Sequence, residues 1–204
     1  MKTLTCTANL YDQRNTEEWV EGYARQGKYQ YVLHRGLLVF PELAGGALRG
    51  RDIQEIQFDL TCSKSGYART KTMYMRRAYK TEPGGTATDW VGESIGTANA
   101  LFYNRSLSIN VKTSAPELYA GLRTWLQEGG QSIALFVDEE LVTNINYSDN
   151  YMGLSEFSMT IVYEDGNLWR HDGEVWNPCE AYYHNGNEFV RCAAYRHNGT
   201  EWEL

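Results

Sequence analysis

Proline and cysteine are scarce in this chain, with four of each among 204 residues. The cysteines stand far apart and share no Cys-x-x-Cys spacing, the pattern that marks many zinc sites and redox-active pairs. They are Cys6, Cys62, Cys179 and Cys192. This distribution indicates neither a zinc site nor a disulfide scaffold, and we expect free thiols.

The chain also lacks a long hydrophobic run. No segment approaches the roughly 20 apolar residues that span a membrane, and the start, MKTLTCTANLYDQ, has no apolar run typical of a secretory signal. We therefore expect no membrane span, and synthesis in the cytoplasm without a signal peptide. Basic residues are outnumbered, because 19 Lys and Arg stand against 26 Asp and Glu for a formal net charge of −7. Without a basic stretch to neutralise phosphates, nucleic acid is not an expected partner.

The motifs of common enzyme classes are absent from the sequence too: it has no Gly-x-Ser-x-Gly elbow, His-Glu-x-x-His pair, P-loop or Gly-x-Gly-x-x-Gly turn. Asp138, Glu139 and Glu140 are adjacent carboxylates, which on a strand point to opposite faces, so a solvated turn explains them more simply than a catalytic pair. Asp149 and Asn150 offer oxygen ligands without EF-hand spacing, and calcium binding there stays open. We predict a protein that is not an enzyme and holds no cofactor and no metal.

Aromatic residues and glycine are abundant, with 15 Tyr, 6 Trp, 6 Phe and 19 Gly. This composition favours strands joined by tight turns. Apolar and polar residues alternate over 56–62 and 157–163, which predicts strands with one buried face. The apolar positions are Ile56, Phe58, Leu60 and Cys62 in the first segment, and Phe157, Met159, Ile161 and Tyr163 in the second.

One helix is predicted near residues 114–129. Ser114 and Glu117 fit a capping box, and Pro116 is acceptable in the first turn. The apolar stripe consists of Leu118, Leu122, Trp125 and Leu126, and Gly129 would end the helix.

The predicted fold is all-β: a jelly-roll-type antiparallel β-sandwich with one crossover helix, followed by a small C-terminal meander of hairpin repeats. We expect an N-terminal strand or arm over residues 1–27, the sandwich over 28–164 and the hairpin tail over 165–204.

The tail repeats one phrase three times, as LWRHDGEVW, YYHNGNEFV and YRHNGTEWEL, and its glycines Gly173, Gly186 and Gly199 stand thirteen residues apart. Asp-Gly and Asn-Gly favour two-residue type I′ turns, so each phrase predicts a hairpin with an aromatic pair across its strands. The pairs are Trp169 with Trp176, Tyr182 with Phe189, and Tyr195 with Trp202. These six side chains are the predicted binding or assembly surface, which three stacked hairpins would share.

Each phrase also carries a histidine: His171, His184 and His197. In a meander, equivalent positions lie about 9.5 Å apart, too far for three of them to bind one Zn²⁺ at about 2.1 Å. We expect each histidine to cover the neighbouring aromatic pair. Convergence on a metal ion by threefold assembly of separate chains stays open as an alternative.

Three tyrosines, Tyr103, Tyr147 and Tyr151, stand in loop-like contexts beside Asn and Asp. Sugars stack on exposed aromatic rings, so these residues are candidate glycan contacts. The alternative is that they pack inside the sandwich.

Three stretches carry a family resemblance: HRGLLVF through TMYMRRA, PELYAGLRTWLQEGGQSIALFV, and YSDNYMGLSEFSMTIVYE. Together they resemble a jelly-roll module of tail and appendage proteins from phages that infect Gram-positive bacteria, which is similar to the DNRLRE-type β-sandwich. The resemblance covers about residues 28–164, and the terminal phrases look like repeats that end many phage structural proteins.

The resemblance implies a virion structural protein of a tail, baseplate, fibre or other appendage, used for assembly or host-surface attachment. Its partners would be other virion proteins and copies of itself, with a trimer favoured. The alternative is a freestanding carbohydrate-binding module that recognises bacterial surface glycans.

Overall fold

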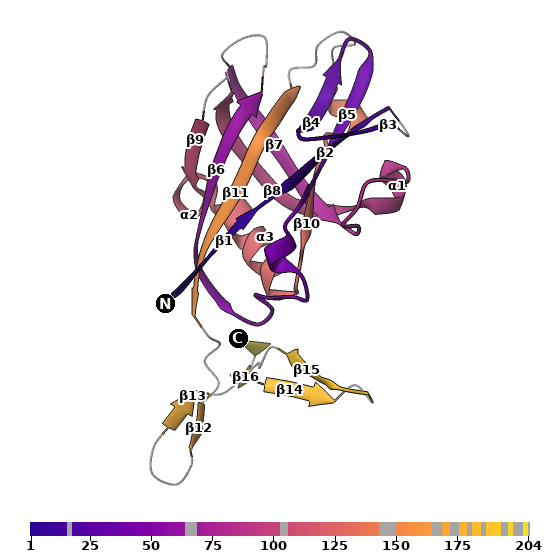
Figure 1. Ribbon diagram of the computed structural model, residues 1–204. Helices are drawn as coiled ribbons and strands as arrows, with labels where there is room; N and C mark the ends of the chain where they lie inside the picture. The colour runs from indigo at the N-terminus through magenta and orange to yellow at the C-terminus, as the bar shows by residue number, and fades with distance from the viewer. Residues whose placement is uncertain are drawn as a thin grey trace.

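The computed structural model describes residues 1–15, 18–63, 69–102, 106–142 and 150–164 of the main body. In the tail it describes 169–171, 176–178, 181–184, 187–192, 196–197 and 202–203. The main body is a sandwich of antiparallel strands that enclose a common core (Figure 1), which confirms the all-β prediction.

Two sheets form the sandwich. Sheet A has the order β9-β6-β11-β1, with β1 (Lys2–Thr7), β6 (Asp52–Ser63), β9 (Ser106–Asn110) and β11 (Met152–Glu164). Sheet B has the order β8-β7-β10-β5-β2-β3, with β2 (Asn9–Arg14), β3 (Glu18–Glu21), β5 (Val32–Val39), β7 (Arg69–Ala78), β8 (Val91–Phe102) and β10 (Ser132–Leu135).

The N-terminal strands join the two sheets. The chain passes from β1 in sheet A to β2 in sheet B at Ala8. The strand β4 (Ala24–Tyr29) pairs with β11 through its first half and with β5 through its second half. The described part of residues 1–27, expected as a separate strand or arm, is therefore part of the sandwich, because its strands complete both sheets.

The run KYQYVLHRGLLVF forms the end of β4, a turn and β5. Gln30 and Tyr31 form the turn with φ angles of 47° and 67°, so both adopt the left-handed conformation that a two-residue hairpin needs. Gly36 lies where backbones approach closely, because a Cβ there would stand 3.0 Å from the Ala24 Cβ and 3.1 Å from the Leu135 Cβ.

Alternation along β6 and β11 builds the core. The inward side chains of β6 from Ile56 to Cys62 and those of β11 from Phe157 to Ile161 are buried, whereas Tyr163 is partly buried against the core. Cys6 and Cys62 are buried and lie outside any disulfide, as expected for these two. The side chains of Cys179 and Cys192 lie outside those described.

The predicted helix is α3 (Pro116–Gln127), and its stripe of Leu118, Leu122, Trp125 and Leu126 is buried. The predicted capping box is wrong. Ser114 ends a separate turn, α2 (Val111–Ser114), whose N-cap is the Asn110 side chain accepting from the Thr113 amide at 3.1 Å. The chain enters α3 through Ala115, which makes no side-chain cap. Further short helices are α1 (Ala87–Trp90), η1 (Pro41–Leu43) and η2 (Glu139–Leu141).

The tail forms three hairpins beyond the end of β11 (Figure 1). They are β12 (Trp169–His171) with β13 (Trp176–Pro178), β14 (Ala181–His184) with β15 (Phe189–Cys192), and β16 (Arg196–His197) with β17 (Trp202–Glu203). In the described part of the tail each hairpin is its own two-stranded sheet, so the expected continuous meander is not formed.

The register of the hairpins also differs from the prediction. His171 pairs with Trp176, His184 with Phe189 and His197 with Trp202. The shift is two residues in each copy, so Trp169 pairs with Pro178 and Tyr182 with Arg191. Asp-Gly and Asn-Gly also occur in longer hairpin connections. The register predicted from a two-residue turn was therefore wrong. A register shift of an even number of residues preserves the alternation of faces along a strand.

Among the described residues, no helix is both long enough and apolar enough to cross a membrane.

Candidate functional site

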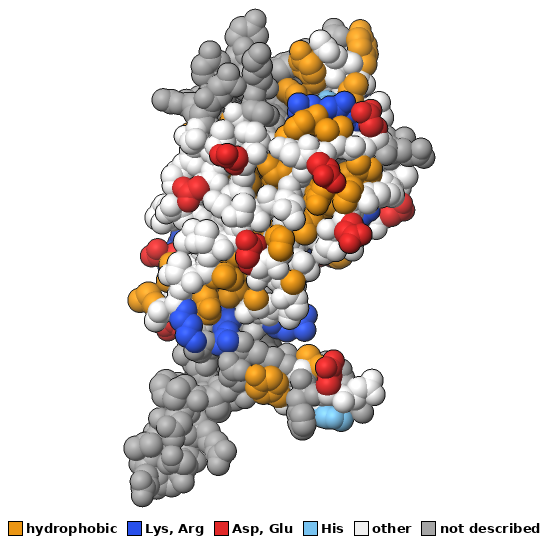
Figure 2. Space-filling view, in the orientation of Figure 1, with side chains coloured by type: hydrophobic (Ala, Val, Ile, Leu, Met, Phe, Trp, Pro, Cys, Tyr) orange, Lys and Arg blue, Asp and Glu red, His pale blue; other side chains and the backbone are white. Residues whose placement is uncertain are grey.

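A groove with both polar and apolar lining residues opens on the outer side of sheet A, beside the crossing from β1 to β2. It has a volume of about 880 Å³. Residues of β6, β9 and β11 line it together with 7–11 and the end of β3 at Glu21 and Gly22. In Figure 2 the left part of the middle of this face is mostly white with isolated red carboxylates, and orange hydrophobic side chains lie to its right.

A β-bulge shapes the groove. The ladder between β11 and β6 shifts register between Leu154 and Glu156, which leaves Ser155 as an extra residue. As a result Ser155 and Glu156 are both exposed, and alternation resumes at the buried Phe157. Bulges re-aim side chains in this way, and here two adjacent polar residues line the groove.

Hydrogen bonds between strands fix the polar groups of the groove floor. Thr61 donates to Glu156 Oε2 at 2.7 Å, and its hydroxyl lies 3.1 Å from that of Ser106. One step along the sheet, Ser108 donates to Asp59 Oδ1 at 2.6 Å. The floor is therefore a preformed grid of hydroxyl and carboxylate oxygens.

The groove is acidic. Glu21, Asp59 and Glu156 are carboxylates, and the described lining residues include no Lys and no Arg. This charge disfavours anions and leaves hydrogen-bond acceptors in excess.

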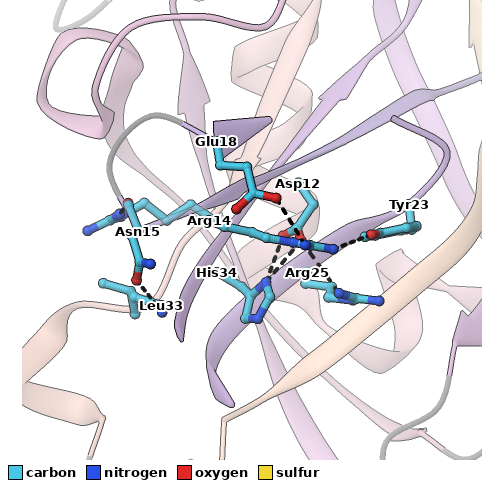
Figure 3. Close-up of polar contacts among 9 residues, drawn as sticks. Asp12, Arg14, Asn15, Glu18, Tyr23, Arg25, Leu33 and His34 are labelled. Carbon is cyan, nitrogen blue, oxygen red and sulfur yellow. Dashed lines mark hydrogen bonds and ion pairs between the residues drawn. The ribbon is translucent and has the colours of Figure 1, made fainter. Parts of the chain in front are cut away.

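A second polar cluster lies at the base of the β4–β5 hairpin (Figure 3). Asp12 is fully buried, and its Oδ2 accepts from His34 Nδ1 at 2.9 Å. The guanidinium groups of Arg14 and Arg25 stand 3.5 and 3.7 Å from the same oxygen. A buried carboxylate needs such partners, and these ones tie β2 to β4 and β5.

Tyr23 completes this cluster. Its hydroxyl accepts from Arg14 at 2.5 Å, and the Arg25 guanidinium lies 4.0 Å from the centre of its ring. The arginines therefore link the buried carboxylate to the surface, and the arrangement serves to hold the hairpin in place.

The structure describes one of the three tyrosines that are candidate glycan contacts. Tyr151 is only 6% exposed, with its ring centre 5.1 Å from that of Tyr29 and 5.6 Å from that of His34. It cannot offer a ring face to a sugar, so this candidate is corrected to a packing residue, and the exposed member of the pair is Tyr29. Tyr103 and Tyr147 lie outside the described residues.

For most residues of the predicted tail surface, the structure describes the backbone but not the side chain. Trp169, Trp176, Tyr182, Phe189 and Trp202 are strand residues, whereas Tyr195 lies outside the described residues. Tyr182 is 53% exposed, and His184 is exposed beside it on β14. The side chains of Trp169, Trp176, Phe189 and Trp202 are not among those described, so their common surface stays a prediction.

The acidic run at 138–140 is a solvated turn, as expected. Asp138 pairs with Arg76 at 2.8 Å, and Glu140 is exposed in η2. Asp149 lies outside the described residues, and the Asn150 amide donates to the Leu141 carbonyl at 3.1 Å. Within the described ranges no three His, Cys, Asp or Glu side chains gather as a metal site.

Comparison with known protein families and with curated proteins finds no match for this chain.

Sequence reasoning missed the groove, although one signal was present. In GLSEFSMT the polar pair Ser155 and Glu156 breaks the alternation that the strand otherwise follows. Such a break indicates a bulge, but the strands that would line the groove with it come from distant parts of the sequence.

Proposed function

We propose that the chain is a non-enzymatic structural protein of a phage virion, part of a tail, baseplate, fibre or other appendage, used for assembly and host-surface attachment. Its partners are other virion proteins and copies of itself, with a trimer as the favoured state. The chain is made in the bacterial host cytoplasm and carried in the virion.

The observation that carries the proposal is the tail. A two-stranded hairpin in water is marginally stable at best. Three such hairpins follow one another here, each with a histidine paired to an aromatic residue, and in the described part they share no ladder. Stable hairpins of this kind need another surface, and copies of the chain or neighbouring virion proteins would supply it.

The sandwich adds support from the family resemblance. The segments that resemble phage appendage modules correspond to β5 through β7, to α3 with β10, and to β11. These elements contribute many of the side chains of the main core, which strands β1, β2, β4 and β8 complete.

The experiment is protein identification in purified virions of the phage whose genome encodes this chain. Peptides of the chain should be found at a copy number that is stable through density-gradient purification, and a deletion should remove an appendage or abolish adsorption. Intact, fully infectious virions without the chain would contradict the proposal.

The alternative is a freestanding carbohydrate-binding module, and the groove on sheet A favours it. Specific glycan binding by an isolated monomer, with no incorporation into particles, would support this alternative over the virion role.

A further inference from the structure

We propose that the groove at the Ser155 bulge binds an uncharged saccharide through the hydroxyl and carboxylate oxygens of its floor. The binding rests on the host-surface attachment proposed above and supplies the class of ligand for it. The saccharide site lies on the sandwich and is separate from the tail hairpins.

The floor is organised before a ligand arrives. Glu156 is held by Thr61 and Asp59 by Ser108, each through a hydrogen bond between neighbouring strands. Gln57 also donates to Asp59 Oδ2 at 3.2 Å. Groups that are already fixed lose little conformational entropy on binding, which favours affinity.

The donor and acceptor pattern suits sugar hydroxyls. Ionised carboxylates only accept hydrogen bonds, whereas serine and threonine hydroxyls both donate and accept. A sugar hydroxyl can donate to Asp59 or Glu156, and also to the hydroxyl oxygen of Ser106 or Ser155. The protons of these two serines face Thr61, whose hydroxyl lies 3.1 Å from that of Ser106 and whose carbonyl accepts from Ser155 at 3.3 Å. A fully ionised phosphate or sulfate group cannot donate, so it gains no hydrogen bond from these carboxylates.

The negative charge of the groove disfavours anionic ligands. The three carboxylates repel anionic polymers, because no Lys or Arg among the described lining residues offsets them. A cationic saccharide is attracted by the same three carboxylates, so a cationic probe beside the neutral ones separates the two classes of ligand. The volume of about 880 Å³ lies within the range of small-ligand sites and has room for several sugar rings.

The test titrates the full chain by isothermal calorimetry. The neutral probes are cellotetraose, maltotetraose and N-acetylchitotetraose, the cationic probe is the glucosamine tetramer, and the anionic probe is a glycerol phosphate polymer. We expect at least one neutral probe to bind, and Glu156→Ala to weaken that binding about tenfold. The matched control is Glu55→Ala, an exposed carboxylate of β6 that does not line the groove, and it should leave the affinity unchanged.

Three results would overturn the proposal: binding of none of the neutral probes, binding of charged probes alone, or an affinity that Glu156→Ala leaves unchanged. Circular dichroism and thermal melting of each variant check that it is folded. Native mass measured on the same samples separates the two proposals. An assembled chain that binds no saccharide refutes the groove alone, whereas a monomer that binds saccharide refutes the assembly alone.

Discussion

The His34 imidazole donates from Nδ1 to the Asp12 carboxylate at 2.9 Å, and both side chains are almost completely removed from solvent, with 4% and 0% exposed. The contact joins β5 to β2 at the point where β4 passes from sheet A to sheet B. It therefore stabilises the corner that the N-terminal strands build.

Replacement of Asp12 should weaken the fold strongly. Asp12→Ala leaves His34, Arg14 and Arg25 without their shared acceptor, and we expect the free energy of unfolding to fall by about 3 kcal/mol. Urea denaturation measures the change. The control is Asp138→Ala, which removes a 62% exposed carboxylate from its pair with Arg76 and should cost less than about 1 kcal/mol. Equal effects of the two substitutions would contradict the role given to Asp12.

Gly121 should not tolerate a methyl group. In an exposed helix Gly→Ala gains about 1 kcal/mol, but a Cβ at Gly121 would stand 1.9 Å from the Ile95 carbonyl oxygen of β8. We expect Gly121→Ala to lower the free energy of unfolding by about 1–3 kcal/mol, because α3 must move away from the strand. The adjacent exposed Ala120→Gly should cost about 1 kcal/mol from helix propensity alone. Stabilisation by Gly121→Ala in thermal melting would show that α3 does not approach β8 so closely.

Cys6 should be unreactive in the folded protein. Burial, with a smaller effect from Glu42, raises the pKa of the Cys6 thiol from 9.0 to about 12. At pH 8 the thiol is neutral, so iodoacetamide should leave Cys6 unmodified in the native protein and modify it after denaturation, as peptide mass mapping would show. Native modification at the rate of an exposed thiol would contradict its burial.

The raised pKa also predicts a pH dependence of stability. The unfolded thiol loses its proton above 9.0, whereas the folded thiol keeps it until about 12. The contribution of Cys6 is therefore fully present below pH 9 and is lost as the pH rises towards 12. The free energy of unfolding of Cys6→Ala should therefore fall less between pH 9 and 12 than that of the unmodified chain, as urea titrations at each pH would measure.

Local patterns predicted the elements whose side chains face one core. The alternation from Ile56 to Cys62 and the stripe from Leu118 to Leu126 are both buried as expected, because each depends on the repeat of a single strand or helix. The turn at Gln30 and Tyr31 was missed because neither residue signals a left-handed conformation.

Local sequence patterns did not predict which strands pair across long distances in the chain. The inclusion of residues 1–27 in both sheets depends on partners in β5 and β11, and the groove depends on β6, β9 and β11 meeting beside a bulge. Tyr151 was misjudged for the same reason, since its burial results from Tyr29 and His34, which come from a distant hairpin. In the tail, the sequence predicted the hairpins but not their register, because Asp-Gly and Asn-Gly are compatible with more than one connection length.

The most direct test of the proposed assembly is the native mass of the full chain compared with a variant that carries Trp176→Ser, Phe189→Ser and Trp202→Ser. These are the aromatic residues paired with histidine in the three hairpins. The account predicts an oligomer, with a trimer favoured, for the unmodified chain and a folded monomer for the variant, with the sandwich intact by circular dichroism. A monomeric unmodified chain, or an oligomer that the three substitutions leave unchanged, would contradict assembly through the tail.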